Sequence, residues 1–190
     1  TAPAPNLAAR SVTARSVAAG LAHSAQRFGD ATALRTADDA ITYRRLGDRA
    51  TRTAAALDRY APDAHSPIVV QLPMSIDAAA IVLGVFTARR PIVALDPELP
   101  RERVSGILDE LARHGRSPGL FVAAAEHLSD ARSVASPRGL AVLDASGITT
   151  DPAVAPTVDP VSPRQDRDDQ VTSIQFTSGS TGAPKGVLHP

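Results

Sequence analysis

Short apolar runs alternate with amphipathic stretches along most of the chain. Two compact β-branched runs, residues 67–72 (PIVVQL) and 91–95 (PIVAL), have the composition of buried strands. Residues 75–89 between them are apolar almost all round, which predicts a buried helix, and Ser75 is a suitable N-cap for it. Residues 101–113 return to helical spacing, with an apolar side chain every three or four positions.

The remaining segments extend this alternation in both directions. The other expected elements are, in chain order, a helix over 17–28, a hairpin from 32–36 and 40–43, a helix over 43–57, strands at 119–123, 140–143 and 171–177, and helical residues at 124–134. Strands that alternate with helices favour βαβ units. The sequence therefore predicts an α/β fold, with a mainly parallel sheet and helices on both faces.

Two segments fall outside the periodic pattern. Residues 1–16 begin with a Pro/Ala run and are expected to be a leader or linker. Residues 144–170 contain four prolines and several aspartates, and are expected to be a surface connection. The rest, residues 17–190, is expected to form one unit. Residues 8–28 also have the Arg-, Ser- and Ala-rich composition of a transit peptide, although the whole chain shares that bias.

Composition excludes several classes of function. Lys+Arg and Asp+Glu are both 20, so the formal net charge of zero disfavours a nucleic-acid binder. Aromatic residues are only 3%, which argues against stacking platforms for single strands, and the lack of Cys removes disulfides and thiolate metal sites. The longest apolar stretch, residues 78–88, is about half of the ~20 residues that a membrane-spanning helix needs. A cytoplasmic protein with no nucleic-acid or membrane partner is expected.

The candidate chemistry is concentrated in residues 177–186, TSGSTGAPKG. Glycines allow positive φ angles and let backbone N–H groups point towards a ligand, while hydroxyls and an ammonium add donors. Together these groups suit polyphosphate oxygens. The candidate ligand-binding residues are Thr177, Ser178, Gly179, Ser180, Thr181, Gly182, Lys185 and Gly186.

This segment is not a Walker A loop. In that motif Gly precedes the Lys and Ser or Thr follows it, whereas Pro184 precedes Lys185 here and Gly186 follows it. Residues 187–188 look like another strand, so no helix N-terminus is expected to hold the phosphates. The alternative is an ordinary flexible hairpin loop. Against it, Lys185 is the one Lys in a chain whose other basic residues are Arg, and a compact ammonium differs chemically from a guanidinium.

Other polar residues have simpler explanations. The five His show no paired ligand spacing, and no metal site is expected among these residues. Arg44 and Arg45 are expected on the wet face of a helix. Arg89 and Arg90 are expected at a helix end, where positive charge suits the helix dipole.

Residues 177–186 resemble the signature phosphate loop of the adenylate-forming enzymes: peptide-synthetase adenylation domains, acyl- and aryl-CoA ligases and luciferases. Residues 41–57 and 84–104 resemble two earlier motifs of that family, in the expected order. In the second of these, residues 89–93 (RRPIV) stand where peptide synthetases typically have a Gly-Ala-Tyr-Val-Pro-like segment. The Asp-Pro-x-x-Pro-x-x-Arg run over residues 96–103 favours the amino-acid-activating branch.

The resemblance implies a reaction and an incomplete domain. A carboxylic or amino acid would attack the α-phosphate of ATP with Mg²⁺ assistance, giving an acyl-adenylate and pyrophosphate. CoA or the pantetheine of a carrier protein would then accept the acyl group. By the same resemblance, Lys185 is the catalytic candidate, and the glycine-rich loop would hold the β- and γ-phosphates.

In the family, the acid, adenine, ribose and Mg²⁺ contacts lie downstream of this loop. The chain is therefore expected to be the N-terminal part of the large adenylation domain, partnered by the remainder of that domain and inactive alone. A non-catalytic adenylation-like scaffold that binds a partner protein is the alternative.

Overall fold

The N-terminal elements form a small layer outside the main sheet. The computed structural model describes residues 16–150, 171–177 and 184–189. The helix α1 (Val17–Phe28) is capped by Ser16, whose hydroxyl accepts a hydrogen bond from the amide of Ala19 at 3.2 Å. The strands β1 (Thr32–Arg35) and β2 (Ala40–Thr42) form the predicted antiparallel hairpin.

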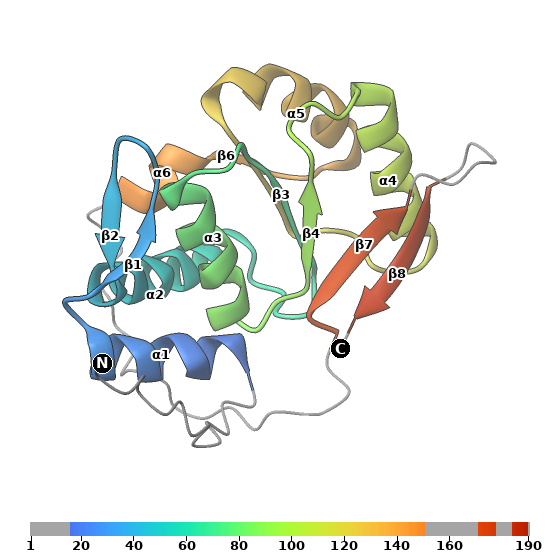
Figure 1. Ribbon diagram of the computed structural model, residues 1–190. Helices are drawn as coiled ribbons and strands as arrows, with labels where there is room; N and C mark the ends of the chain where they lie inside the picture. Colours follow the sequence, from blue (N-terminus) through green and yellow to red (C-terminus); the bar gives the residue numbers. More distant parts are fainter. Residues whose placement is uncertain (1–15, 151–170, 178–183, 190) are drawn as a thin grey trace, which may run out of the picture.

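The hairpin leads directly into α2 (Tyr43–Tyr60), because Thr42 caps this helix at the amide of Arg45. The apolar face of α2 is the predicted stripe, and Leu46, Ala50, Ala54 and Leu57 are all buried. A cluster that includes Leu21 and Ile41 joins α1 and the hairpin to α2. Figure 1 shows these elements gathered at one end of the molecule.

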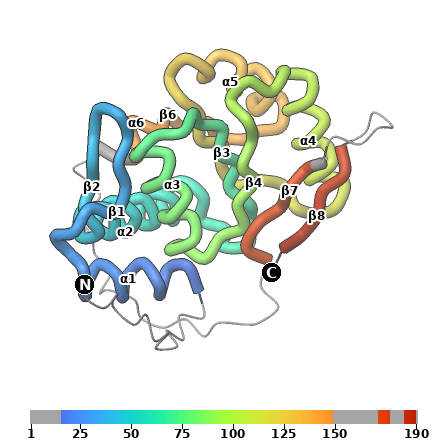
Figure 2. The backbone as a smooth tube through the Cα atoms, viewed as in Figure 1, coloured from blue at the N-terminus to red at the C-terminus, as the bar shows by residue number. Residues whose placement is uncertain are grey.

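A second sheet of six strands organises the rest of the described chain. Its strands are β3 (Ile68–Gln71), β4 (Ile92–Leu95), β5 (Leu120–Ala123), β6 (Val142–Asp144), β7 (Ser173–Thr177) and β8 (Lys185–His189). The spatial order is β6-β5-β3-β4-β7-β8. The first five strands run parallel, and β8 runs antiparallel to β7, as the arrows in Figure 1 show. Figure 2 shows β8 beside β7 at the edge of the sheet. The predicted mainly parallel sheet is therefore confirmed.

Helices cover both faces of this sheet, as predicted. The helices α2, α3 (Ile76–Thr87) and α6 (Ala145–Thr150) contribute to one core cluster. The helices α4 (Arg101–Arg113) and α5 (Leu128–Ala135) contribute to the other. The central strand β3 serves both layers: Ile68 and Val70 belong to the first cluster and Val69 to the second. This alternation follows from the two-residue period of a strand.

The connection expected over residues 144–170 begins later than the sequence indicated. Asp144 ends β6, and α6 follows at once. Ile148 is 2% exposed and packs in the core with α2 and α3, and the partly buried Ala145 packs against the same cluster, so these two side chains help to anchor this short helix. Its polar composition hid it from periodicity arguments. Residues 151–170 of the expected connection, and residues 1–15 of the expected leader, lie outside the described residues.

Arg90 has a different role from the one its position suggested. It is 1% exposed, and its guanidinium donates to the backbone carbonyls of Ala61, Asp63 and Ser66. Ala61 is the C-cap of α2, so the cation lies at the end of a distant helix rather than at the solvated end of α3. Burial lowers the pKa of Arg90 from its usual value, and the nearby carboxylates of Asp58 and Asp63 oppose that shift.

No helix among the described residues is both long enough and apolar enough to cross a bilayer.

Candidate functional site

The residues on either side of the glycine-rich segment are paired across two strands. Thr177 is the last residue of β7 and Lys185 the first of β8, and the two are register partners. Paired strands lie about 5 Å apart, so the ends of the segment are held close together. Residues 178–183 between them lie outside the described part of the chain. Of the candidate ligand residues, the structure therefore describes Thr177, Lys185 and Gly186.

Lys185 lies at the carboxyl edge of the parallel sheet. β7 runs parallel to β4, so Thr177 lies at the edge where β3, β4, β5 and β6 also end. In open α/β sheets this edge is where ligands bind. Lys185 is exposed, and among the described residues no carboxylate forms an ion pair with it. Its ammonium is therefore available to an anion.

Phe176 explains why Gly follows the Lys. Phe176 and Gly186 are register partners, and a Cβ built on Gly186 would lie 3.2 Å from Cε1 and Cζ of the Phe176 ring. The other side of Phe176 packs against the core cluster under α4. A side chain at residue 186 would therefore compete with the ring for the same space.

Pro184 rests against α4 on the other side of the hairpin. A Cβ built on Gly106 would meet Cγ and Cδ of Pro184 at 3.6 and 3.9 Å, which is ordinary contact. The helix thus supports the chain immediately before Lys185. Phe176 and Gly106 were not among the sequence candidates. The apolar alternation of residues 171–177 marks Phe176 as inward-facing, whereas nothing in the sequence pairs Gly106 with Pro184.

A profile of the family described as AMP-binding enzyme matches residues 21–190. The chain belongs to the AMP-binding enzyme family. This match covers the hairpin, both helix layers and the glycine-rich segment. It confirms the resemblance that the motifs indicated.

Curated relatives of this AMP-binding chain include peptide synthetases of Streptomyces viridochromogenes. Phosphinothricin tripeptide synthetase PhsC is 32% identical over 174 residues, which are 90% of this chain and 15% of that protein. PhsB from the same organism is 34% identical over 188 residues, or 93% of this chain and 14% of that protein. The chain therefore spans only a small part of the curated relatives it matches.

Solved structures agree with the fold. The structure of VinN with 3-methylaspartate has a TM-score of 0.77 and 25% identity, over 92% of this chain and 47% of VinN. The fatty acyl CoA synthetase of Mycobacterium tuberculosis has a TM-score of 0.75 and 17% identity, over 92% of this chain and 34% of that one. The described α/β architecture is thus that of part of larger AMP-binding enzymes.

Neither the described His nor the described carboxylates form a metal site. Within residues 16–150, 171–177 and 184–189, no group of three His, Cys, Asp or Glu is placed to hold an ion. His189 is exposed in β8, and its backbone carbonyl accepts a hydrogen bond from the amide of Thr172.

Proposed function

We propose that this chain contributes the N-terminal portion of an adenylate-forming enzyme, which activates a carboxylic or amino acid with ATP. The observation that carries the proposal is the placement of Lys185 at the carboxyl edge of the sheet, opposite Thr177, in a chain matched by the AMP-binding family over residues 21–190. The cytoplasm, where ATP is available, is the compartment we expect.

In the proposed reaction a carboxylate oxygen of the acid attacks the α-phosphorus of ATP. A bond forms between that carboxylate oxygen and the α-phosphorus. At the same time the bond from the α-phosphorus to the oxygen that bridges the α- and β-phosphates breaks, and pyrophosphate leaves with the electron pair of the broken bond. The Lys185 ammonium would neutralise charge on the β- and γ-phosphates as it builds up. The hydroxyls of Ser178, Ser180 and Thr181, and the backbone N–H groups at Gly179, Gly182 and Gly186, would orient the same oxygens.

Mg²⁺ would supply further charge neutralisation on the phosphates. The glycine-rich segment has hydroxyls, N–H groups and an ammonium but no carboxylate, the protein ligand through which Mg²⁺ is usually held. We therefore place the Mg²⁺ ligands outside this chain, together with the contacts to adenine, ribose and acid.

The acceptor of the acyl group is proposed to be a thiol, either CoA or a carrier-protein pantetheine. The named peptide synthetases among the relatives support the carrier-protein route and an amino acid as substrate. The Asp96 carboxylate accepts from the amide of Glu98 at 2.9 Å. The Asp-Pro run thus forms the turn before α4. A structural turn of this kind fits enzymes that use CoA and enzymes that use a carrier protein equally well.

Substitution of Lys185 in a full-length enzyme that contains this sequence tests the proposal. Lys185→Ala should slow carboxylate-dependent ATP–pyrophosphate exchange by about 10- to 150-fold, because a charge-assisted hydrogen bond contributes about 1.5–3 kcal/mol. Lys185→Arg should recover only part, since the guanidinium differs in shape. Arg45→Ala, an exposed cation on α2, is the matched control and should leave exchange unchanged. Equal exchange in Lys185→Ala would refute the assignment.

A second measurement separates the enzyme from the scaffold alternative. The purified 190-residue chain should show no exchange by itself, because the acid and adenosine contacts are supplied elsewhere and misplacement by about 1 Å costs on the order of 100-fold. Exchange restored by adding the downstream part of the domain supports the enzyme. Exchange by the chain alone would show that the active site has been misplaced.

A further inference from the structure

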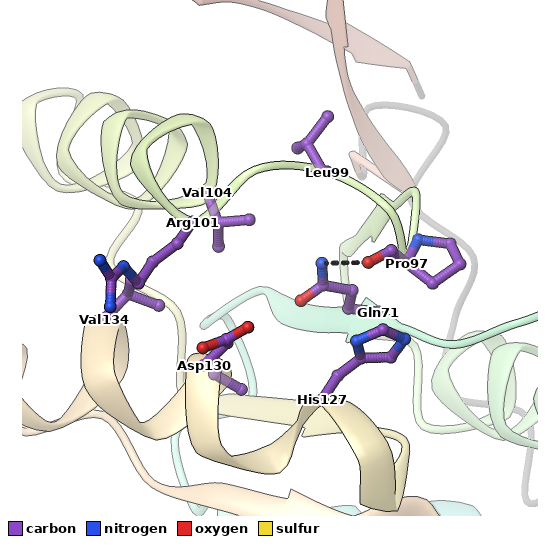
Figure 3. A pocket seen from close by; sticks show the side chains of 9 residues that line it. Gln71, Pro97, Leu99, Arg101, Val104, His127, Asp130 and Val134 are labelled. Carbon is purple, nitrogen blue, oxygen red and sulfur yellow. Dashed lines mark hydrogen bonds between the residues drawn. The ribbon is translucent and has the colours of Figure 1, made fainter.

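A hollow lies at the carboxyl edge of the sheet, on the side covered by α4 and α5 (Figure 3). It is lined by residues that include Gln71, Leu99, Arg101, Val104, His127 and Asp130, and its cavity volume is about 30 Å³. A cavity needs about 10–15 Å³ to hold one water molecule. This hollow therefore has room for a group about the size of an ammonium, and anything attached to that group must lie at the open mouth.

The hollow has a topological cause. β3 and β5 are neighbours, but β3 leads into α3 on one face of the sheet and β5 leads into α5 on the other. Because the chain leaves these two neighbouring strands towards opposite faces of the sheet, a crevice remains beyond the ends of β3 and β5. Gln71 is the last residue of β3 and lies at the base of this crevice.

The orientation of the Gln71 amide is fixed by its surroundings. Gln71 is 5% exposed, and its Nε2 donates to the carbonyls of Asp96 and Pro97, both at 3.2 Å. Flipping the amide would set its oxygen against these two carbonyl oxygens. Oε1 must therefore face away from them, and Figure 3 shows it directed into the hollow. Among the described residues, no donor reaches this oxygen.

Two further side chains meet the same space from α5 and the turn before it. The Asp130 carboxylate and the His127 imidazole lie three residues apart and both line the hollow. Within the described part of the chain, neither side chain has a hydrogen-bond or ion-pair partner. Arg101 at the rim is exposed and pairs with Glu102 at 3.6 Å. Apart from Arg101 at the rim and an N–H of the His127 ring, the polar groups that line the hollow are acceptors.

We propose that this hollow binds a primary ammonium group at the end of a short aliphatic chain. An ammonium has three N–H donors. They match Gln71 Oε1, the Asp130 carboxylate and a ring nitrogen of His127. Leu99 and Val104 would contact the attached methylenes. The Asp130 charge and the unpaired Gln71 oxygen would repel a carboxylate or phosphate.

The proposed site does not depend on the proposed function. α4 lies between the hollow and Pro184, with Val104 towards the hollow and Gly106 towards Pro184. A free alkylamine and a lysine side chain of a protein partner present the same group. The two sources can therefore be distinguished only by experiment.

NMR titration of the isotope-labelled chain tests the site. n-Butylammonium should shift the Gln71 side-chain amide and the His127 imidazole signals, and should bind more tightly than methylammonium by about fourfold for each methylene that becomes buried. Tetramethylammonium, which has the charge but no N–H, should cause no such shifts. Asp130→Asn should weaken n-butylammonium at least tenfold. Asp38→Asn, an exposed carboxylate in the β1–β2 turn, is the matched control and should not change binding.

Further titrations distinguish a lysine side chain from a free amine, and both of these from other cations. If Nα-acetyl-lysine methylamide binds as tightly as n-butylammonium, the occupant is a lysine side chain; if only n-butylammonium binds, it is a free amine. The proposal is overturned if neither amine shifts Gln71 at up to about 100 mM, far above a millimolar dissociation constant. It is also overturned if tetramethylammonium binds equally well, or if Mg²⁺ or Zn²⁺ shifts these signals while the amines do not.

Discussion

The ring of Phe176 occupies the space over Gly186 that any side chain on the neighbouring strand would need. The two residues are register partners, and the ring carbons lie 3.2 Å from a Cβ built on Gly186. One step along each strand from this pair are Thr177 and Lys185. The aromatic residue therefore helps to set the register that places Lys185 at the edge of the sheet.

Gly186→Val should loosen this hairpin. A branched side chain would push against the Phe176 ring, and such overpacking costs about 1–3 kcal/mol. Hydrogen exchange should show reduced amide protection across β7 and β8. Leu188→Val places a branched residue at an exposed position of the same strand and should leave protection unchanged. Phe176→Leu combined with Gly186→Val should recover part of the loss. Full protection in Gly186→Val would show that the ring moves aside freely.

The crossing of α2 and α3 depends on Gly84. A Cβ built there would lie 2.4 Å from Cβ and Cγ2 of Thr53, which is fully buried in α2. Gly84→Ala should therefore destabilise the fold by about 1–3 kcal/mol in urea denaturation, despite the better helix propensity of Ala. Gly147→Ala in α6 has nothing within 4 Å of its Cβ and should be neutral or stabilising by up to about 1 kcal/mol. The same sign for both substitutions would contradict the close crossing.

The inner strands β3 and β5 were predictable because they are buried on both faces. Residues 68–71 read as a continuous apolar run ended by Gln71, and all four are buried. The amphipathic stripe of α4 was equally clear, because Val104 and Leu108 lie on one helical face. Short-range patterns suffice where one element buries one face. They fail for α6, where the packing described is that of Ile148 and the partly buried Ala145, too few apolar side chains to give a periodic pattern.

For the glycine-rich segment the sequence predicts a chemistry but not the surroundings of the residues. The spacing of glycines and hydroxyls with Lys185 predicts phosphate binding, since those residue types suit phosphate oxygens. The support for Lys185 comes from cross-strand and helix contacts that depend on register and tertiary packing. Gln71 and Asp130 likewise meet only because β3 and β5 are neighbours in space.

Arg90 should matter far more to stability than an exposed arginine. Arg90→Met would leave the carbonyls of Ala61, Asp63 and Ser66 without their donors, at a cost of about 2–4 kcal/mol in the free energy of unfolding. Arg45→Met on the exposed face of α2 should change it by less than about 0.5 kcal/mol. Urea denaturation of both variants checks this. Similar midpoints for the two would place Arg90 among the dispensable surface charges.

Asp63 makes the stability of the loop that Arg90 contacts depend on pH. Its carboxylate accepts hydrogen bonds from the Ser66 hydroxyl at 2.5 Å and from the amide of His65 at 3.0 Å. These two bonds, the one from Ser66 first, hold the pKa of Asp63 below its usual value. A carboxyl whose pKa is lower in the folded state stabilises the fold above its unfolded pKa, near 3.9. That contribution is lost as the pH falls through the folded pKa.

Asp63→Asn should therefore be less stable than the wild type at pH 6, and the gap between their urea midpoints should close towards pH 3. The neutral Asn side chain mimics the protonated acid, so the two proteins differ least where Asp63 itself is protonated. Ser66→Ala should show the same trend, because it removes the main donor to the charged form. A gap that stays constant from pH 6 to pH 3 would mean that the Asp63 charge makes no contribution to folding, and that the loop is held by Arg90 alone.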